Sequence, residues 1–213
     1  QTINYKNKSA NKQFVDSLHH TGFAVLRNHP INKELISSIY KEWGEFFKND
    51  YKHSYTFNYD TQDGYFPYRS ENAKGYIEKD LKEFFHYYEW GMYPKNISNK
   101  TKELHYELVK LGQELLAWID NLTPDSIRLN FSMPLSEMIH NSKTNLLRII
   151  HYPPLKEDIK KGAIRAAAHE DINLITLLVT GTQSGLQVLN KDNMWIDVEC
   201  NPGWLIINIG DML

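Results

Sequence analysis

The stretch Ala166-Ala-Ala-His-Glu-Asp-Ile-Asn-Leu-Ile-Thr-Leu-Leu-Val179 decides how this chain is interpreted. Its apolar run, Ile172–Val179, is typical of a strand that is buried on both faces. His169 and Asp171 stand directly before that run. In extended backbone, alternate residues point to the same side, so this imidazole and this carboxylate would share one face and Glu170 the other. One imidazole and one carboxylate are two thirds of a facial triad for iron(II).

The triplet also has a plainer explanation, which is a salt-bridged pair at the end of a strand. The chain has nine histidines, so such triplets arise by chance, and His105-Tyr-Glu107 is another. That second triplet lies in a helical pattern, where positions i and i+2 do not share a face, so we set it aside. Spacing alone leaves both the metal site and the ion pair open.

The pattern of apolar residues changes near residue 145 and predicts an α+β protein. Residues 1–144 are mainly helical in pattern, and residues 49–78 are irregular. The expected helices cover Phe14–His20, Asn32–Phe46, Lys79–Trp90, Ser98–Leu122 and, broken near Pro134, Asp125–Asn141. Short strands with turns between them follow over 145–213, which is typical of a sandwich or jelly roll. No linker divides the chain, so we expect one domain over 1–213.

Composition excludes several classes of protein. Lys and Arg number 24 and Asp and Glu number 26, for a net charge of -2 in 213 residues. A protein that binds nucleic acid or a membrane surface through bulk positive charge is therefore not expected. No run of 18 apolar residues is present, and the first residues contain no apolar signal segment. The single cysteine, Cys200, fits a reducing compartment, so we expect a cytoplasmic protein.

Blocks spread along the chain resemble a known family, the iron(II)/2-oxoglutarate-dependent oxygenases, and within it the isopenicillin N synthase-like subgroup. The resemblance runs from about residue 14 to 213, with the blocks in the family's order. Arg148-Ile-Ile-His-Tyr152-Pro-Pro resembles a family strand that usually reads R-x-N-Y-Y-P-P. The other blocks are Gly22–Val25, Asn28–Ile31, Gly64-Tyr65, Glu71, Lys74-Gly75, Asp80–Glu83, His169–Thr176, Gly185–Val188, Trp195–Val198, Pro202-Gly203 and Asn208–Met212.

This resemblance implies a double-stranded β-helix (jelly-roll) core behind an N-terminal helical region. It implies iron(II) and 2-oxoglutarate as cofactors, with molecular oxygen and a small organic molecule as the reactants. His169 and Asp171 match the first two iron ligands, and Tyr152 matches a tyrosine that hydrogen-bonds the distal carboxylate of 2-oxoglutarate. Alternation places Arg148 on the same strand face as Tyr152, so it is a second candidate for co-substrate binding, with a structural arginine as the alternative.

The chain departs from the family pattern in two places. The family has a second histidine as third iron ligand, and then an arginine with a nearby serine for the co-substrate, after the block that Asn208–Met212 matches. No histidine follows His169 before Leu213. We therefore expect the sequence to be part of a longer protein, with the last jelly-roll strands and the third ligand downstream; the alternative is a truncated, inactive relative. Ile150-His151 also replaces Asn-Tyr, and His151 is the first alternative to test as a ligand.

The function implied is oxidation of a small organic molecule by an iron(II)/2-oxoglutarate-dependent dioxygenase. One alternative is an oxidase of the same fold that needs no 2-oxoglutarate. Another is a jelly-roll binding module without catalytic activity. The resemblance does not indicate the substrate or the oligomeric state.

Overall fold

The computed structural model describes the chain apart from residues 72–78, 156–162 and 191–192, and its residues divide into two compact units. Unit 1 is built from three separate segments and unit 2 from two. The segments of unit 1 are 1–33, 106–140 and 170–213, and those of unit 2 are 34–105 and 141–169. The fold is mixed helix and sheet, as predicted.

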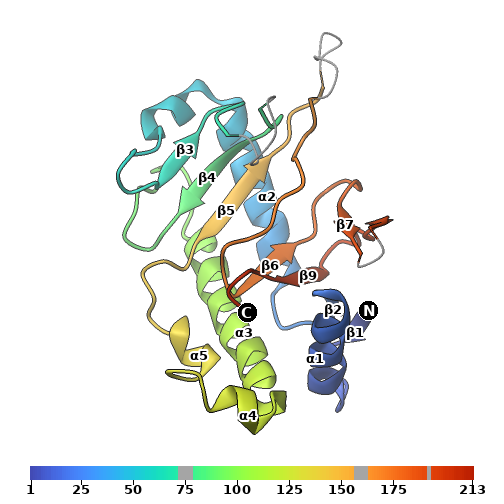
Figure 1. The fold of residues 1–213 in the computed structure, drawn as a ribbon. Coiled ribbons are helices and arrows are strands. Elements are labelled where there is room, and N and C mark those ends of the chain that lie inside the picture. The colour runs from blue at the N-terminus through green and yellow to red at the C-terminus, as the bar shows by residue number, and fades with distance from the viewer. Residues whose placement is uncertain (72–78, 156–162, 191–192) are drawn as a thin grey trace. The chain divides into compact units, whose positions relative to one another are not determined.

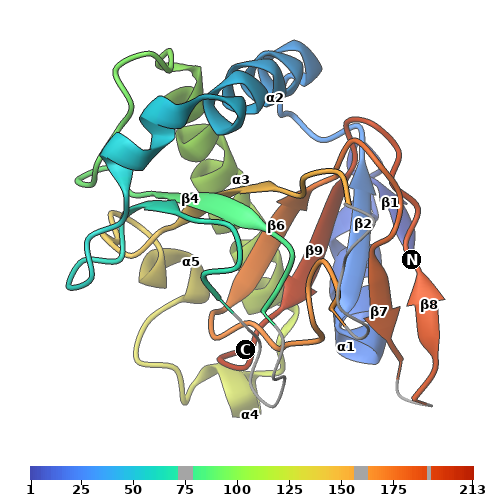
Figure 2. The ribbon, with the colours of Figure 1, turned by 90° about the horizontal axis from the view of Figure 1, so that it is seen from above.

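Unit 1 contains a four-stranded sheet with the order β1-β2-β9-β6. Its strands are β1 (Thr2–Asn4), β2 (Phe23–Arg27), β6 (Ile175–Val179) and β9 (Leu205–Ile209). β1 runs parallel to β2, while β9 pairs antiparallel with both β2 and β6. Figure 2 shows β2, β9 and β6 side by side. Leu205, Ile206 and Ile207 of β9 are buried, so the central strand carries the apolar core of this sheet.

Helix α1 (Ala10–Thr21) lies next to β2 and covers the helix expected at Phe14–His20. It ends at Gly22, which has a φ of 72° and donates its N–H to the Leu18 carbonyl at 2.7 Å. This left-handed conformation is the reason for glycine at that position, because an L side chain is strained there. An added Cβ would otherwise meet only Ile209, at an ordinary contact distance of 3.7 Å.

Other elements of unit 1 agree with the sequence-based expectations. The predicted break near Pro134 separates α4 (Asp125–Arg128) from α5 (Leu135–Met138). Two of the short strands expected over 145–213 are β7 (Gln187–Leu189) and β8 (Trp195–Asp197), which pair antiparallel; residues 191–192 lie outside the described residues.

The double burial predicted for Ile172–Val179 is wrong. β6 begins only at Ile175, and each of its residues is half-buried. Ile172 lies before the strand and its side chain is 84% exposed. The physical reason is the position of β6, which lies at the edge of the four-stranded sheet within the described part of the chain. An apolar run indicates a strand, but it does not show how many neighbours cover that strand.

Unit 2 contains an antiparallel three-stranded sheet with the order β3-β4-β5. Its strands are β3 (Gly64–Phe66), β4 (Glu83–Tyr87) and β5 (Leu147–His151), and a 3-10 helix, η1, covers Asp50–Tyr55. The helix predicted over Lys79–Trp90 is therefore wrong, because β4 occupies its centre. Residues 49–78 were also expected to be irregular, yet they contain η1 and β3. Aromatic residues favour strands when partners exist on both sides, as β3 and β5 supply here.

Helix α2 (Lys33–Lys48) packs its apolar side against one face of this sheet (Figure 1). The Trp43 ring lies 4.9 Å from the Phe85 ring, and the Phe47 ring stacks on His151 at 5.2 Å. The buried Trp43 indole donates a hydrogen bond to the Thr101 hydroxyl at 2.8 Å. Thr101 belongs to α3 (Lys100–Leu122), which corresponds to the helix predicted over Ser98–Leu122. The first residues of α3 belong to unit 2 and the rest to unit 1.

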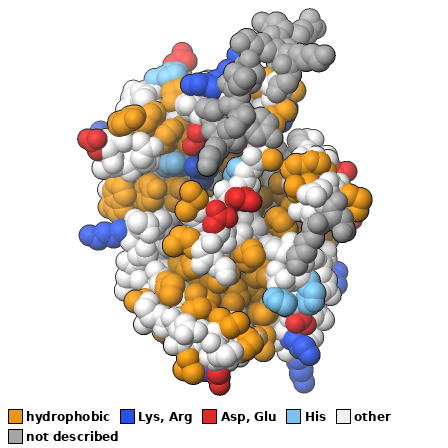
Figure 3. Space-filling model, in the orientation of Figure 1, with side chains coloured by type: hydrophobic (Ala, Val, Ile, Leu, Met, Phe, Trp, Pro, Cys, Tyr) orange, Lys and Arg blue, Asp and Glu red, His pale blue; other side chains and the backbone are white. Residues whose placement is uncertain are grey.

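The surface agrees with the near-zero net charge. On the face drawn in Figure 3, basic and acidic side chains are interspersed, with hydrophobic side chains between them. Among the helices that the structure describes, none combines the length and apolar composition required to span a membrane.

Candidate metal and co-substrate site

His169 lies at the end of unit 2, in a segment without regular secondary structure. Its Nδ1 is 2.9 Å from the carbonyl oxygen of Ala167. A carbonyl oxygen can only accept a hydrogen bond, so Nδ1 carries the proton in this contact. The lone pair then lies on Nε2, the nitrogen through which such a histidine binds a metal. Metal-binding histidines commonly donate their other ring N–H to a backbone carbonyl, and His169 fits that pattern.

Asp171 belongs to unit 1 and precedes β6. Its Oδ2 accepts hydrogen bonds from the Thr176 hydroxyl at 2.6 Å and from the Asn208 side-chain amide at 2.9 Å. These two donors come from adjacent strands, because Thr176 of β6 and Asn208 of β9 are paired in register. Two donors on one oxygen fix the orientation of the carboxylate, as the partners of a ligating carboxylate do.

The backbone around Asp171 is held by the segment that follows β9. Asp211 N–H donates to the Asp171 carbonyl at 2.9 Å, and Gly210 N–H donates to the Leu174 carbonyl at 3.0 Å. A Cβ on Gly210 would lie 2.6 Å from the Asp171 carbonyl oxygen and closer still to that of Asn173. Only glycine allows this approach between the two segments.

The donor chemistry of His169 and Asp171 fits iron(II), since imidazole and carboxylate are the ligand types of the facial triad. His169 is oriented by a hydrogen bond within unit 2, and Asp171 is oriented by hydrogen bonds within unit 1. In the described residues no group of three or more His, Cys, Asp or Glu side chains is arranged to hold a metal. By residue type, His169 and Asp171 account for two of the three donors that a facial triad requires.

Arg148, on β5, is held by two side chains of unit 2. Its Nε donates to Nε2 of His86 at 2.9 Å, and its guanidinium lies 3.7 Å from the Glu71 carboxylate. The guanidinium carbon also lies 4.7 Å from the centre of the Phe84 ring. These contacts agree with a structural arginine. Because they engage Nε and one terminal nitrogen, only some of the guanidinium N–H groups could contact a ligand.

Tyr152 follows β5 and keeps a side chain that is 38% exposed. Burial raises the pKa of its phenol, the nearby Asp80 carboxylate adds to this, and the cations Lys82, Arg148 and Arg165 act in the opposite direction. The hydroxyl therefore stays protonated at neutral pH and is able to donate a hydrogen bond to an anion.

His151 points away from Arg148, as alternation along β5 requires. Its Nδ1 lies 2.7 Å from the Glu83 carboxylate and its ring stacks on Phe47 of α2. Glu83 also accepts hydrogen bonds from Lys52 and Tyr65. Burial alone would raise the pKa of Glu83, but these three donors outweigh it and hold the pKa below its usual value. These contacts account for His151, which is half-buried in unit 2.

Sequence reasoning identified the two candidate ligands, and Asn173 as a possible donor near Asp171, but not Ala167, Thr176 and Asn208, which contact the ligands directly. Thr176 and Asn208 bind the Asp171 carboxylate directly, and Asn173 acts one step further away by donating to the Thr176 hydroxyl at 2.9 Å. Asn208 lies in the Asn208–Met212 block that resembles the oxygenases, which was the one available signal.

Comparisons with known proteins show the family of the chain. Residues 143–213 match the model of the 2OG-Fe(II) oxygenase superfamily, and residues 4–107 match that of the N-terminal region of non-haem dioxygenases in morphine synthesis. A solved structure of a candidate oxygenase from Shewanella oneidensis is 51% identical, with a TM-score of 0.90, and the match covers 100% of this chain and 77% of that one.

A second solved structure, of a 2OG-Fe(II) oxygenase family protein from Caulobacter crescentus, is 27% identical over 100% of this chain and 74% of that one, with a TM-score of 0.77. The 2-oxoglutarate-dependent dioxygenase htyE of Aspergillus rugulosus is 26% identical over 90% of this chain. The chain spans 65% of the length of that relative.

The chain belongs to the 2OG-Fe(II) oxygenase superfamily. Members of this family are 2-oxoglutarate-dependent dioxygenases, with iron(II) and 2-oxoglutarate as cofactors and a jelly-roll fold.

Proposed function

We propose that the protein is an iron(II)- and 2-oxoglutarate-dependent oxygenase that oxidises a small organic molecule. The observation that carries the proposal is the orientation of the two candidate ligands. The His169 ring has its proton assigned to Nδ1 by the Ala167 carbonyl, and the Asp171 carboxylate is fixed by Thr176 and Asn208. Such outer hydrogen bonds orient both ligands, and donation from Nδ1 to a carbonyl raises the basicity of the imidazole.

In this proposal His169 holds iron(II) through Nε2 and Asp171 holds it through the carboxylate, with a further ligand outside the described residues. Iron(II) and 2-oxoglutarate, when bound, supply the oxygen chemistry, in which the co-substrate loses CO2 to give succinate and the substrate is oxidised. The contribution of the chain is to hold these groups and to exclude water from them.

Tyr152 is the proposed donor to a carboxylate of 2-oxoglutarate, because its hydroxyl is protonated and partly exposed. We assign Arg148 a supporting role on the same strand face, since Glu71 and His86 already engage its guanidinium. The proposed architecture is a single oxygenase domain over residues 1–213, with a helical region over 1–144 and the first jelly-roll strands over 145–213. A cytoplasmic location remains a prediction from Cys200.

The first test measures metal binding by Asp171→Ala. Removing the carboxylate takes away a ligand and leaves the cation less neutralised, so both iron(II) binding and turnover should be lost. Glu170→Ala is the matched control, because it removes the neighbouring, exposed carboxylate and should leave both properties unchanged. Stoichiometric iron in Asp171→Ala, measured by metal analysis of the folded protein, would refute the assignment.

The second test measures the apparent KM for 2-oxoglutarate in Tyr152→Phe. A hydrogen bond to a charged group contributes about 1.5–3 kcal/mol, so the KM should rise roughly ten- to a hundred-fold. Tyr68→Phe is the control, because its ring is similarly exposed, at 40%. Turnover that is equal with and without added 2-oxoglutarate would instead favour the oxidase alternative, and binding of a small molecule without turnover would favour a binding module.

A further inference from the structure

The segment that carries His169 has no helix or strand of its own, so contacts with other parts of unit 2 must place it. Two hydrogen bonds attach the segment to the residues before β4. Leu81 N–H donates to the Ile164 carbonyl at 2.9 Å, and Ala167 N–H donates to Oδ1 of Asp80 at 3.1 Å. Both ends of the second bond are buried, since Asp80 is 3% and Ala167 is 2% exposed. A buried hydrogen bond to a carboxylate is among the stronger contacts available to a loop.

Asp80 is itself held in place from several directions. Its Oδ2 accepts a hydrogen bond from the Lys82 ammonium at 2.9 Å, so its two oxygens serve two different donors. The Asp80 N–H donates to the Glu71 carbonyl at 3.0 Å. The Lys82 ammonium also lies 3.3 Å from the Glu71 carboxylate, which in turn pairs with Arg148. The ammonium fixes the orientation of this buried carboxylate through the 2.9 Å contact.

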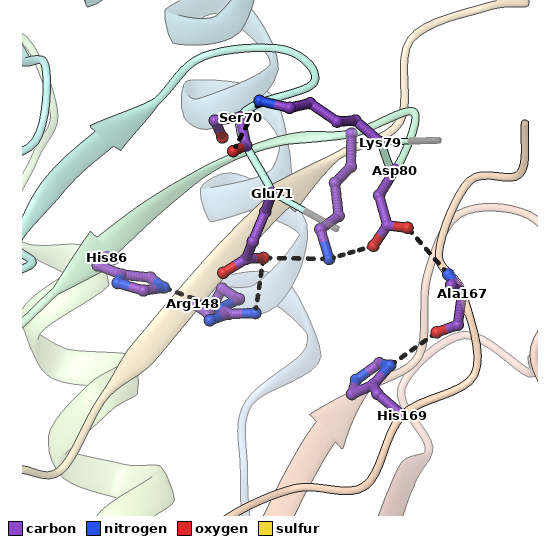
Figure 4. A network of polar contacts seen from close by, with 9 residues as sticks. Ser70, Glu71, Lys79, Asp80, His86, Arg148, Ala167 and His169 are labelled. Atoms are coloured by element: carbon purple, nitrogen blue, oxygen red, sulfur yellow. Dashed lines mark hydrogen bonds and ion pairs between the residues drawn. The ribbon is translucent and has the colours of Figure 1, made fainter. Parts of the chain in front are cut away.

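The backbone of Ala167 connects Asp80 to the ring of His169 through two hydrogen bonds. Its N–H donates to Asp80, and its carbonyl accepts the Nδ1 proton of His169. Figure 4 shows the Asp80 carboxylate directed at the Ala167 nitrogen and the Ala167 carbonyl directed at the His169 ring. A shift of Ala167 would therefore move the acceptor that fixes both the tautomer and the ring orientation.

We infer that Asp80 is a positioning residue for His169, acting through the backbone of Ala167; the inference rests on the proposed function of His169 as an iron ligand. Asp80 contacts neither a substrate nor a metal in this scheme. It lies far from the His169-x-Asp171 motif in sequence, in the Asp80–Glu83 block that resembles the N-terminal helical region of the family. Loss of a partner that orients a ligand typically weakens metal affinity 10- to 100-fold.

The experiment titrates Mn(II), a redox-inert substitute for iron(II), into the metal-free protein expressed in full, with free Mn(II) followed by EPR. Asp80→Ala should weaken the Mn(II) Kd by about 10- to 100-fold. The matched control is Asp63→Ala, which removes another buried carboxylate of unit 2, one that accepts from the Met92 N–H and the Thr61 hydroxyl. This control should lose stability but keep the wild-type Kd.

A second pair of variants protects the test against misfolding of Asp80→Ala. Asp80→Asn keeps the size of the side chain, but its single carbonyl oxygen must serve both Ala167 N–H and the Lys82 ammonium. Its Mn(II) affinity should therefore fall, and adding Lys82→Met should restore it by removing the competing donor. A purely structural role for Asp80 would make the double variant weaker than the single one.

His169→Ala separates failure of this inference from failure of the proposed function. If wild-type protein binds Mn(II) and His169→Ala loses it, while folded Asp80→Ala binds as tightly as wild type, the positioning role is overturned and the ligand assignment stands. If His169→Ala keeps the wild-type Kd, both proposals are overturned. Weakening in Asp80→Ala but not in Asp63→Ala, together with recovery in the Asp80→Asn, Lys82→Met double variant, is the result we expect.

Discussion

Acidification should destabilise the protein through His86, a histidine of β4 that is buried in its neutral form. Only 6% of its surface is exposed, its Nδ1 donates to the Gln62 carbonyl at 2.9 Å, and its Nε2 accepts from Arg148. Burial is the largest cause of a pKa lowered to about 4, and the Arg148 charge is the next. Lys82 lowers the pKa further, whereas the Gln62 carbonyl and Glu71 act in the opposite direction.

The sign of the pH dependence follows from the two states. The unfolded chain takes up a proton on this residue near pH 6.5, while the folded protein resists protonation until about pH 4. The unfolded state thus binds more protons in this window, so the free energy of unfolding falls as the pH falls. At about 1.4 kcal/mol for each pH unit, the loss reaches about 3 kcal/mol by pH 4.

Urea unfolding followed by tryptophan fluorescence, at several pH values between 4 and 7, measures this loss. His86→Gln is the reference, because a glutamine side chain accepts from Arg148 without titrating. The free energy of unfolding of the wild type should fall more steeply than that of the variant by about 3 kcal/mol over the window. Equal slopes in the two proteins would refute the reasoning, as would an NMR titration of the His86 ring with its midpoint near 6.5.

Two further substitutions test the packing. Gly210→Ala should destabilise the protein by about 1–3 kcal/mol or more, because the new methyl group would overlap the carbonyl oxygens of Asp171 and Asn173. An unchanged urea midpoint would show that the two segments separate readily. Thr101→Val should cost about 1–3 kcal/mol by leaving the buried Trp43 indole N–H without its acceptor. Thr101→Ser should retain most of the stability, and a serine variant as unstable as the valine one would contradict this explanation.

Local patterns predicted the helices well, because amphipathic spacing is a property of neighbouring residues. The leucines of α3 are an example, since Leu104, Leu108, Leu111 and Leu115 recur at helical spacing and are all buried. β4 was assigned wrongly because its state depends on β3 and β5, which are distant in sequence. The edge position of β6 was missed for a similar reason, because a short stretch of sequence does not show how many strands pair with it in the sheet.

The candidate site shows the same division. His169 and Asp171 stand close together in the chain, so their spacing carries the signal. The residues that orient these two side chains are distant from them in sequence. Asn208 lies on β9, the strand that pairs with β6, and Asp80 lies in the segment before β4. The Asp80–Glu83 block resembles the oxygenases, but that resemblance assigns no role to the carboxylate at position 80, and only the fold reveals its hydrogen bond to Ala167.

The central position of β9 has a consequence for the order in which the protein forms during synthesis. Synthesis of unit 2 is complete at position 169. Its three strands can therefore pair before the last segment of unit 1 has been made. β2 is translated long before β9, yet Phe23 pairs with Asn208 and Leu26 with Leu205. The sheet of unit 1 therefore stays incomplete until β9 is made, and the edge of β2 that pairs with β9 stays unpaired until then. Pairing over such a separation is slow, so chaperone contacts in the nascent chain should concentrate on β2.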